Sequence, residues 1–157
     1  MTSRSQGIDA TSAGIVIADT SGILAAFDTS SPESDSAFKV LEAAGLVVLS
    51  PLILAELDHA GRRALGQAHA VSMIEDITAQ ARLGLFEIAT LTTDVLEQAN
   101  AVRTLYPALR LDLTDAVGVA LAAEYETDAI LTLDRRDFRA LTPLTSHKAF
   151  RVLPDDL

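Results

Sequence analysis

Several residue types are absent from this 157-residue sequence, or scarce in it, and each absence excludes something. There is no cysteine, which excludes disulfides, thiolate metal sites and a cysteine nucleophile. There is no tryptophan, and aromatic residues make up 4% of the chain, which leaves little for a base-stacking platform. The longest apolar run covers residues 116–123, whereas a membrane span needs about 18–20 residues. We therefore expect no membrane-spanning segment.

Basic residues are also scarce. Lysine and arginine number 12 against 22 acids, which gives a formal net charge of −10. A protein that coats nucleic acid without sequence preference should be basic. The balance argues against such a protein, yet it permits a local carboxylate cluster that holds a divalent cation or meets a basic partner segment.

Apolar residues make up 49% of the chain, which is typical of a folded protein, and the length predicts one domain. Residues 1–13 are polar and lack the apolar stretch of a signal peptide. We expect a flexible leader at 1–13, then a single domain at 14–154. The lack of cysteine and of a signal peptide together predict a cytoplasmic protein.

Short β-branched runs alternate with helix-length segments, which is typical of an α/β domain. Ser50 before Pro51 marks a helix start, and Gly45 marks a helix end. Asp94 and Glu97 have the spacing of a capping box at another helix start. We predict strands at 14–18, 46–49, 85–91, 129–133 and 150–153, and helices at 20–27, 35–44, 51–65, 69–83, 94–106, 114–125 and 135–141.

Four acids stand near the predicted strand ends. Asp19 follows the first strand and Asp134 follows the fourth. Glu56 lies in the helix after the second strand, and Asp115 opens the apolar helix that precedes the fourth. Ligands of open parallel sheets bind beyond the carboxyl ends of the strands. Carboxylates that converge there repel one another unless a cation joins them, and Mg²⁺ or Mn²⁺ prefers oxygen ligands. The pattern predicts a divalent cation site.

Helix capping is the alternative role for these acids. Asp19, Asp112 and Asp134 all stand where an N-cap belongs. The second and third of these are followed three positions later by another aspartate, as in a capping box. For each one taken alone, capping is the favoured interpretation. Glu56 has no capping role, so it is either a surface residue or a ligand at a cleft.

Four sequence blocks, each with its acid, follow one another in a recognisable order. They are IADTSGIL at 17–24, SPLILAEL at 50–57, LTDA at 113–116 and LTLDRRDF at 131–138. Together they resemble the PIN-domain ribonucleases, and most of all the VapC-type toxins of bacterial toxin–antitoxin pairs. The resemblance covers the chain from about Ile15 to Leu153. It implies a three-layer α/β/α fold with a mostly parallel central sheet and an acidic pocket at the strand ends.

The resemblance also implies site residues of two ranks, with Mg²⁺ as cofactor and Mn²⁺ as its substitute. Thr132 is instead interpreted as a β-branched strand residue without a site role. The first rank, catalytic and metal-binding, is Asp19, Glu56, Asp115 and Asp134; the second is Asp112, Asp137, Ser21 and Thr20.

The activity implied is hydrolysis of RNA that leaves a 5′-phosphate and a 3′-hydroxyl. The substrate is a tRNA or a ribosomal RNA, which the motifs do not separate. Arginines near the pocket are expected to hold RNA phosphates. The alternative is a set of solvated helix faces with ordinary ion pairs. These arginines are Arg62, Arg63, Arg135, Arg136 and Arg139.

Two protein partners are implied by the same resemblance. One is a VapB-type antitoxin, whose C-terminal segment would deliver an arginine or lysine to the pocket. We expect this segment to cover apolar surface near Leu52, Ile53 and Leu57. The other is a second copy of the chain in a homodimer. Its candidate interface residues, which the core could equally absorb, are Leu24, Phe27, Phe38 and Leu41.

Other functions remain open at this point. A PIN-like fold that serves only as a binding module would be expected to lack one of the four acids, and none is lacking. A phosphatase resembling the haloacid dehalogenases needs a second aspartate two residues after the first, and that position is Ser21. DNA in place of RNA is a further possibility, which a nuclease assay would settle.

Overall fold

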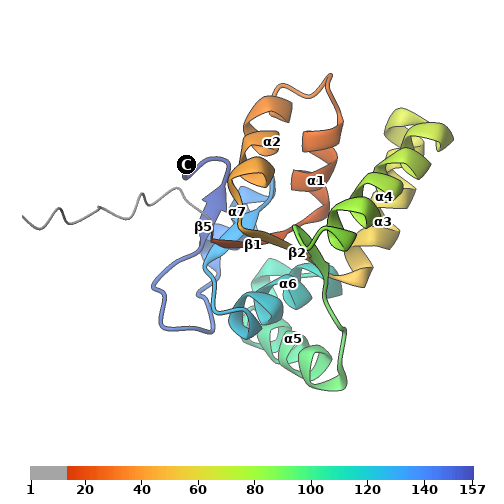
Figure 1. Cartoon of the computed structure of the whole chain (residues 1–157). Coiled ribbons are helices and arrows are strands. Elements are labelled where there is room, and N and C mark those ends of the chain that lie inside the picture. The colour runs from red at the N-terminus through yellow and green to blue at the C-terminus, as the bar shows by residue number, and fades with distance from the viewer. Residues whose placement is uncertain (1–13) are drawn as a thin grey trace, which may run out of the picture.

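The computed structural model describes residues 14–157 (Figure 1). The leader expected at 1–13 lies outside the described residues. All strand pairs of the sheet are parallel, and the strand order is β3-β2-β1-β4-β5. The strands are β1 (Ile15–Ala18), β2 (Leu46–Leu49), β3 (Phe86–Ile88), β4 (Ala129–Leu131) and β5 (Arg151–Leu153).

Helices cover both faces of the sheet, so the three-layer α/β/α prediction is confirmed (Figure 1). Helices α1 to α4 pack on one face, and α5, α6 and α7 pack on the other. Their bounds are α1 (Thr20–Phe27), α2 (Ser34–Ala43), α3 (Pro51–Leu65), α4 (Gln67–Arg82), α5 (Thr93–Leu105), α6 (Leu113–Glu124) and α7 (Arg135–Ala140), with a 3-10 turn at Pro107–Leu109.

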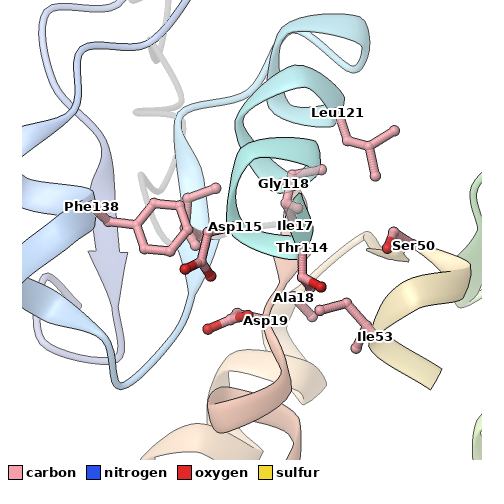
Figure 2. A pocket seen from close by; sticks show the side chains of 11 residues that line it. Ile17, Ala18, Asp19, Ser50, Ile53, Thr114, Asp115, Gly118, Leu121 and Phe138 are labelled. Atoms are coloured by element: carbon pink, nitrogen blue, oxygen red, sulfur yellow. The ribbon is translucent and has the colours of Figure 1, made fainter. Parts of the chain in front are cut away.

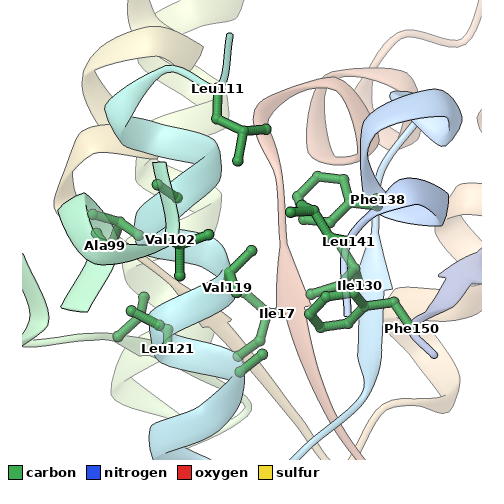
Figure 3. Packing of buried hydrophobic residues seen from close by; sticks show 14 of the residues in the cluster. Ile17, Ala99, Val102, Leu111, Val119, Leu121, Ile130, Phe138, Leu141 and Phe150 are labelled. Atoms are coloured by element: carbon green, nitrogen blue, oxygen red, sulfur yellow. The ribbon is translucent and has the colours of Figure 1, made fainter. Parts of the chain in front are cut away.

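Alternate strand residues enter opposite layers of the core. Ile17 and Ile130 contact the α5–α6–α7 layer, where Phe138 and Phe150 meet edge to face with ring centroids 6.0 Å apart (Figure 3). Val16 faces the α1–α4 layer. Because helices cover both faces of the sheet, the strand sequences are continuous apolar runs and do not alternate between apolar and polar residues.

The order in which strands are added to the sheet switches sides at β1, which makes the gap between β1 and β4 a topological switch point. The chain runs outward from β1 through β2 to β3, then returns to place β4 and β5 on the other side of β1. Such a switch point leaves a crevice at the carboxyl ends of the two adjoining strands. Gly22 of α1 lies directly against the end of β4: a Cβ there would stand 2.6 Å from the Leu131 carbonyl oxygen. Only glycine permits this close approach.

Two local predictions were wrong. The strand expected at 85–91 is shortened to Phe86–Ile88, because it pairs with β2 only at this sheet edge. The cap of α5 is Thr92, whose Oγ1 accepts the Val95 N–H at 3.2 Å, and Asp94 lies within the first turn. In the first turn, the Asp94 carboxylate still interacts favourably with the positive end of the helix dipole. The cap at Ser50 is confirmed, with Leu52 N–H donating to its Oγ at 3.1 Å.

Among residues 14–157, no helix combines the length and the apolarity that crossing a membrane requires.

Candidate active site

A small pocket lies at the switch point, beyond the ends of β1 and β4. Asp19 and Asp115 line it from the end of β1 and the first turn of α6, and Figure 2 shows their carboxylates next to each other. Ser50, Thr114 and Phe138 also line it. The enclosed space is about 10 Å³, room for about one water molecule. The carboxylates therefore lie over closely packed core rather than in a deep cavity.

Asp19 stands at the N-cap position of α1, yet its side chain caps nothing within the described residues. Its Oδ2 instead accepts hydrogen bonds from Thr132 Oγ1 at 2.8 Å and from Ser21 Oγ at 3.2 Å. Burial raises the pKa of Asp19, and the neighbouring Glu56 charge raises it further. The capping role favoured for this residue alone is wrong, and the carboxylate is held at the pocket.

Asp115, Asp134 and Asp137 place carboxylate oxygens within 4.8 Å of one another. Asp134, like Asp19, occupies an N-cap position without a capping bond to any described residue. Burial raises the pKa of Asp115 to about 8, with further contributions from Asp19, Asp112 and the other two members of this group. Asp137, which sequence placed in the second rank, thus belongs to the centre of the acidic cluster.

Asp112 is the acid for which the capping interpretation holds. Its Oδ1 accepts the Asp115 N–H at 2.9 Å, so it caps α6. Glu56, in α3, lies close enough to Asp19 for its charge to raise the pKa of that residue, and its Oε2 accepts a hydrogen bond from Thr20 Oγ1 at 3.0 Å. The structure therefore brings the second-rank residues Thr20 and Asp112 next to first-rank acids, as positioning groups.

Thr132 is a site residue that the sequence interpretation missed. Its side chain is fully buried, and its Oγ1 donates to Asp19 Oδ2 while accepting the Asp134 N–H at 2.9 Å. Ser21 Oγ lies 3.2 Å from Thr132 Oγ1 and accepts the Leu133 N–H at 2.9 Å. The two hydroxyls fix the ends of β1 and β4 to each other. The available signal was a hydroxyl residue in an apolar strand, two positions before an aspartate.

We call the six acids around this point the pocket acids. Their charges are uncompensated by protein: no arginine or lysine in the described part of the chain pairs with any of them. Clustered carboxylates without a basic partner form the donor set that a hard divalent cation prefers, and the pKa is raised at two of them, Asp19 and Asp115. The residues thus fit Mg²⁺ or Mn²⁺. The pocket acids are Asp19, Glu56, Asp112, Asp115, Asp134 and Asp137.

The arginines expected at the pocket rim divide into two groups. Three form ion pairs: Arg62 with Asp58, Arg135 with Glu33 and Asp155, and Arg139 with Asp156. For these three, the structure matches the ion-pair alternative. The other two are exposed and pair with no acid among residues 14–157, and RNA contact remains a prediction for them; they are Arg63 and Arg136.

The surfaces expected to meet protein partners need one correction. Ile53 and Leu57 are buried in the α1–α4 layer, so no antitoxin segment can cover them. They face the core because α3 turns one apolar stripe inward. Among the candidate dimer residues, Phe38 is 50% exposed. The remaining three pack partly buried against the core: Leu24, Phe27 and Leu41.

Comparisons with known proteins agree with this geometry. The PIN domain family model matches residues 16–142. Ribonuclease VapC26 of Mycobacterium tuberculosis is 34% identical over 140 residues, which cover 88% of this chain and all of that protein. Among solved structures, M. tuberculosis VapC20, described as a sarcin–ricin loop cleaving toxin, matches with a TM-score of 0.65 at 20% identity, over 76% of this chain and 89% of that one.

A second solved structure, VapBC2 of Rickettsia felis bound to a promoter DNA fragment, has a TM-score of 0.58 at 18% identity, over 83% of this chain and 96% of that one. Both structures support the fold. This chain belongs to the PIN domain family and, by its similarity to VapC26 over that protein's whole length, to the VapC ribonucleases within it. The resemblance stated from the sequence is confirmed.

Proposed function

We propose that this chain is a divalent-cation-dependent endoribonuclease that acts as the toxin of a toxin–antitoxin pair. The observation that carries the proposal is the group of pocket acids at the switch point, which lacks any ion-paired arginine or lysine from the described chain. Family membership supplies the reaction class: VapC26, which is similar over its full length, is a ribonuclease.

The cation would be held by Asp115, Asp134 and Asp137, with Asp19 facing them across the pocket. When bound, Mg²⁺ supplies Lewis acidity, which offsets negative charge at a phosphate and makes water more acidic. Glu56 stands apart from the three-aspartate group and is held by Thr20. We assign to Glu56 the orientation of the attacking water and acceptance of its proton. The products would be a 5′-phosphate and a 3′-hydroxyl.

The substrate is an RNA of the translation machinery, tRNA or ribosomal RNA. VapC20, which shares the fold, is described as cleaving the sarcin–ricin loop. Arg136, exposed beside Asp134 and Asp137, is the arginine we assign to hold an RNA phosphate, together with Arg63 on α3. A few such contacts can bring RNA to a protein of net charge −10 because they act locally at the pocket.

The partner is a VapB-type antitoxin that inserts a basic side chain among the pocket acids. An arginine can pair two carboxylates at once, and so supplies the positive charge of the cation without its Lewis acidity. The VapBC2 structure, which shares this fold, supports an antitoxin as the partner. An antitoxin lacking every basic residue in its C-terminal segment should lose most of its inhibition. Full inhibition by that variant would refute this arrangement.

Three further parts of the proposal concern the whole chain. Residues 14–154 form one domain, the protein acts in the cytoplasm, and two copies associate through helices of the first half, with Phe38 at the contact. If light scattering at micromolar concentration finds a monomer, the proposed dimer is refuted.

The deciding experiment is an RNase assay on the pure chain, free of antitoxin. We expect cleavage with Mg²⁺ or Mn²⁺, none with EDTA, and none from Asp19→Asn or Glu56→Gln. Expression in bacteria should slow growth, and the same variants should relieve it. A folded wild-type chain that binds neither cation and cleaves no RNA would instead favour the binding-module alternative. Preferential cleavage of DNA would show that the substrate is DNA and not RNA.

A further inference from the structure

Arg135, the first residue of α7, joins three segments of the chain. Its Nε donates to Asp155 Oδ2 at 2.6 Å, and its Nη2 donates to Glu33 Oε2 at 2.7 Å. Glu33 lies in the turn between α1 and α2, and Asp155 lies in the turn after β5. A planar guanidinium can bridge two carboxylates in this way, whereas an ammonium acts as a single point charge.

A second arginine strengthens the same connection. Arg139 donates from two nitrogens to the two carboxylate oxygens of Asp156, at 3.1 and 2.8 Å. Asp156 Oδ2 also accepts the Val152 N–H at 2.8 Å, so the last turn of the chain is fixed to β5. We call this group the C-terminal ion-pair cluster: Glu33, Arg135, Arg139, Asp155 and Asp156.

Helix α7 carries Asp134 at its N-cap and Asp137 in its first turn, and its Phe138 lines the pocket and packs against Phe150. The helix has six residues, and Phe138 is its buried residue. Asp134 forms no capping bond with residues 14–157, and its backbone N–H is held by Thr132. Phe138 thus anchors α7 in the core, and the two ion pairs of Arg135 tie the start of the helix to Glu33 and Asp155.

We propose that Arg135 is a positioning residue: through α7 it holds Asp134 and Asp137 at the distance from Asp115 that cation binding requires, and it does not contact RNA. This inference rests on the proposed function, since it concerns the same cation site. Its two carboxylate partners already neutralise the guanidinium, which leaves less charge for a phosphate. The neighbouring Arg136, which has no acid partner among the described residues, is the phosphate contact.

A purely electrostatic role and a positioning role of Arg135 predict opposite changes in cation affinity for Arg135→Ala. Removing a positive charge near an acidic pocket should tighten cation binding, whatever the charge was doing. If Arg135 positions α7, Arg135→Ala should weaken binding despite that effect, because ligands must be held within about 0.5 Å of their productive geometry. Arg136→Ala removes the same charge one residue away without breaking an ion pair, and is the matched control.

The experiment is calorimetric titration of the full chain with Mn²⁺ at 25 °C, for wild type, Arg135→Ala, Arg135→Lys and Arg136→Ala. We expect Arg135→Ala to bind about three- to tenfold more weakly, at or below the low end of the range for groups that orient metal ligands. Arg135→Lys should resemble it, because lysine does not bridge both acids. Arg136→Ala should bind Mn²⁺ at least as tightly as wild type, but RNA more weakly.

Two further readouts separate positioning from a general loss of structure. RNase activity of Arg135→Ala should return to the wild-type level at saturating Mn²⁺. Adding Glu33→Gln to it should cost nothing more, since the ion pair of Glu33 is with Arg135 and has already been lost. Wild-type affinity for Mn²⁺ in Arg135→Ala would overturn the inference alone. A wild-type chain that binds no Mn²⁺ would overturn the proposed function, and this inference with it.

Discussion

Asp115 is half-buried and Asp156 is exposed, and the pKa values of these two aspartates move in opposite directions. Burial and four neighbouring carboxylates raise the pKa of Asp115 to about 8. The Arg139 guanidinium and a backbone N–H lower the pKa of Asp156. The difference lies first in burial and then in the partners, and not in the residue type. In the C-terminal ion-pair cluster, each acid is paired with an arginine, whereas no arginine or lysine among residues 14–157 pairs with a pocket acid.

Acids paired with arginine belong to the support of the fold, whereas the pocket acids fit the cation that we propose for them. Compensated acids contribute little, because exposed ion pairs are worth about 0–1 kcal/mol. Uncompensated, partly buried acids cost stability unless a proton or a cation joins them. A protein retains such a cost where function requires it, as perturbed pKa values at functional sites illustrate.

The largest expected effect comes from changing one acid of each kind. Asp134→Asn should lower RNase activity by at least about a hundredfold, since direct ligands matter more than the outer groups that cost 10- to 100-fold. Asp128→Asn, which removes a carboxylate paired with Arg151 at the opposite end of β4, should retain activity within about twofold. Initial rates on one RNA at saturating Mg²⁺ measure both. Equal losses of activity in the two variants would show that pairing with an arginine does not distinguish the acids that matter for activity.

The next effect concerns the hydroxyl that supports the pocket acids. Thr132→Val should weaken Mn²⁺ binding about 10- to 100-fold, because Asp19 loses a donor and the Asp134 N–H loses its acceptor. The buried N–H left unpaired should also lower the free energy of unfolding by about 1–3 kcal/mol. Thr132→Ser keeps the hydroxyl and should recover most of the affinity. If valine and serine behave alike in titration, Thr132 is only a strand residue.

A smaller effect is expected on stability and its dependence on pH. The metal-free folded chain keeps the Asp115 proton up to about pH 8, whereas an unfolded aspartate releases it near pH 4. The free energy of unfolding should therefore fall as the pH rises between these values, and the raised pKa of Asp19 adds to the same slope. Asp115→Asn should flatten the slope.

At pH 8, Asp115→Asn should raise the free energy of unfolding of the metal-free chain by roughly 1 kcal/mol, or about 2–4 °C. This free energy is far smaller than the whole pKa shift of Asp115 would give, because water reaches the carboxyl group and screens its charge. Thermal melts in EDTA measure it, and Mn²⁺ should stabilise wild type more than the variant. A variant that melts below wild type at pH 8 would show that the carboxylate is already compensated.

The smallest effect belongs to a compensated acid on a helix surface. Asp58 and Arg62 form an exposed pair one turn apart on α3, at 3.3 Å. Asp58→Asn should lower the free energy of unfolding by about 0.3–0.5 kcal/mol, and 1 M salt should abolish the difference. Urea denaturation at low and high salt is the measurement. A stabilising change would place Asp58 with the uncompensated acids.

The sequence by itself determined the fold class and the element order, and it placed the first-rank acids near the predicted strand ends. The parallel sheet is readable because its strands are apolar throughout and its helices are periodic, both local properties. Asp19 and Asp134 were identified because strand ends are local features too. The resemblance then supplied the family, which the comparisons confirm. The bounds of β3 were missed because pairing at a sheet edge is not a local property, and the cap at Thr92 was missed because Asp94 is an equally good capping residue by type.

Only the tertiary structure decided what each acid does. Asp112 and Asp19 have the same cap-like position in the sequence, yet one caps its helix and the other bonds to Thr132, which is 113 residues away along the chain. Arg135 and Arg136 are adjacent and of the same type, but one bridges two distant acids and the other pairs with none of the described ones. The reason is physical: a side chain's charge state and role depend on its neighbours in space, and strand order sets those neighbours.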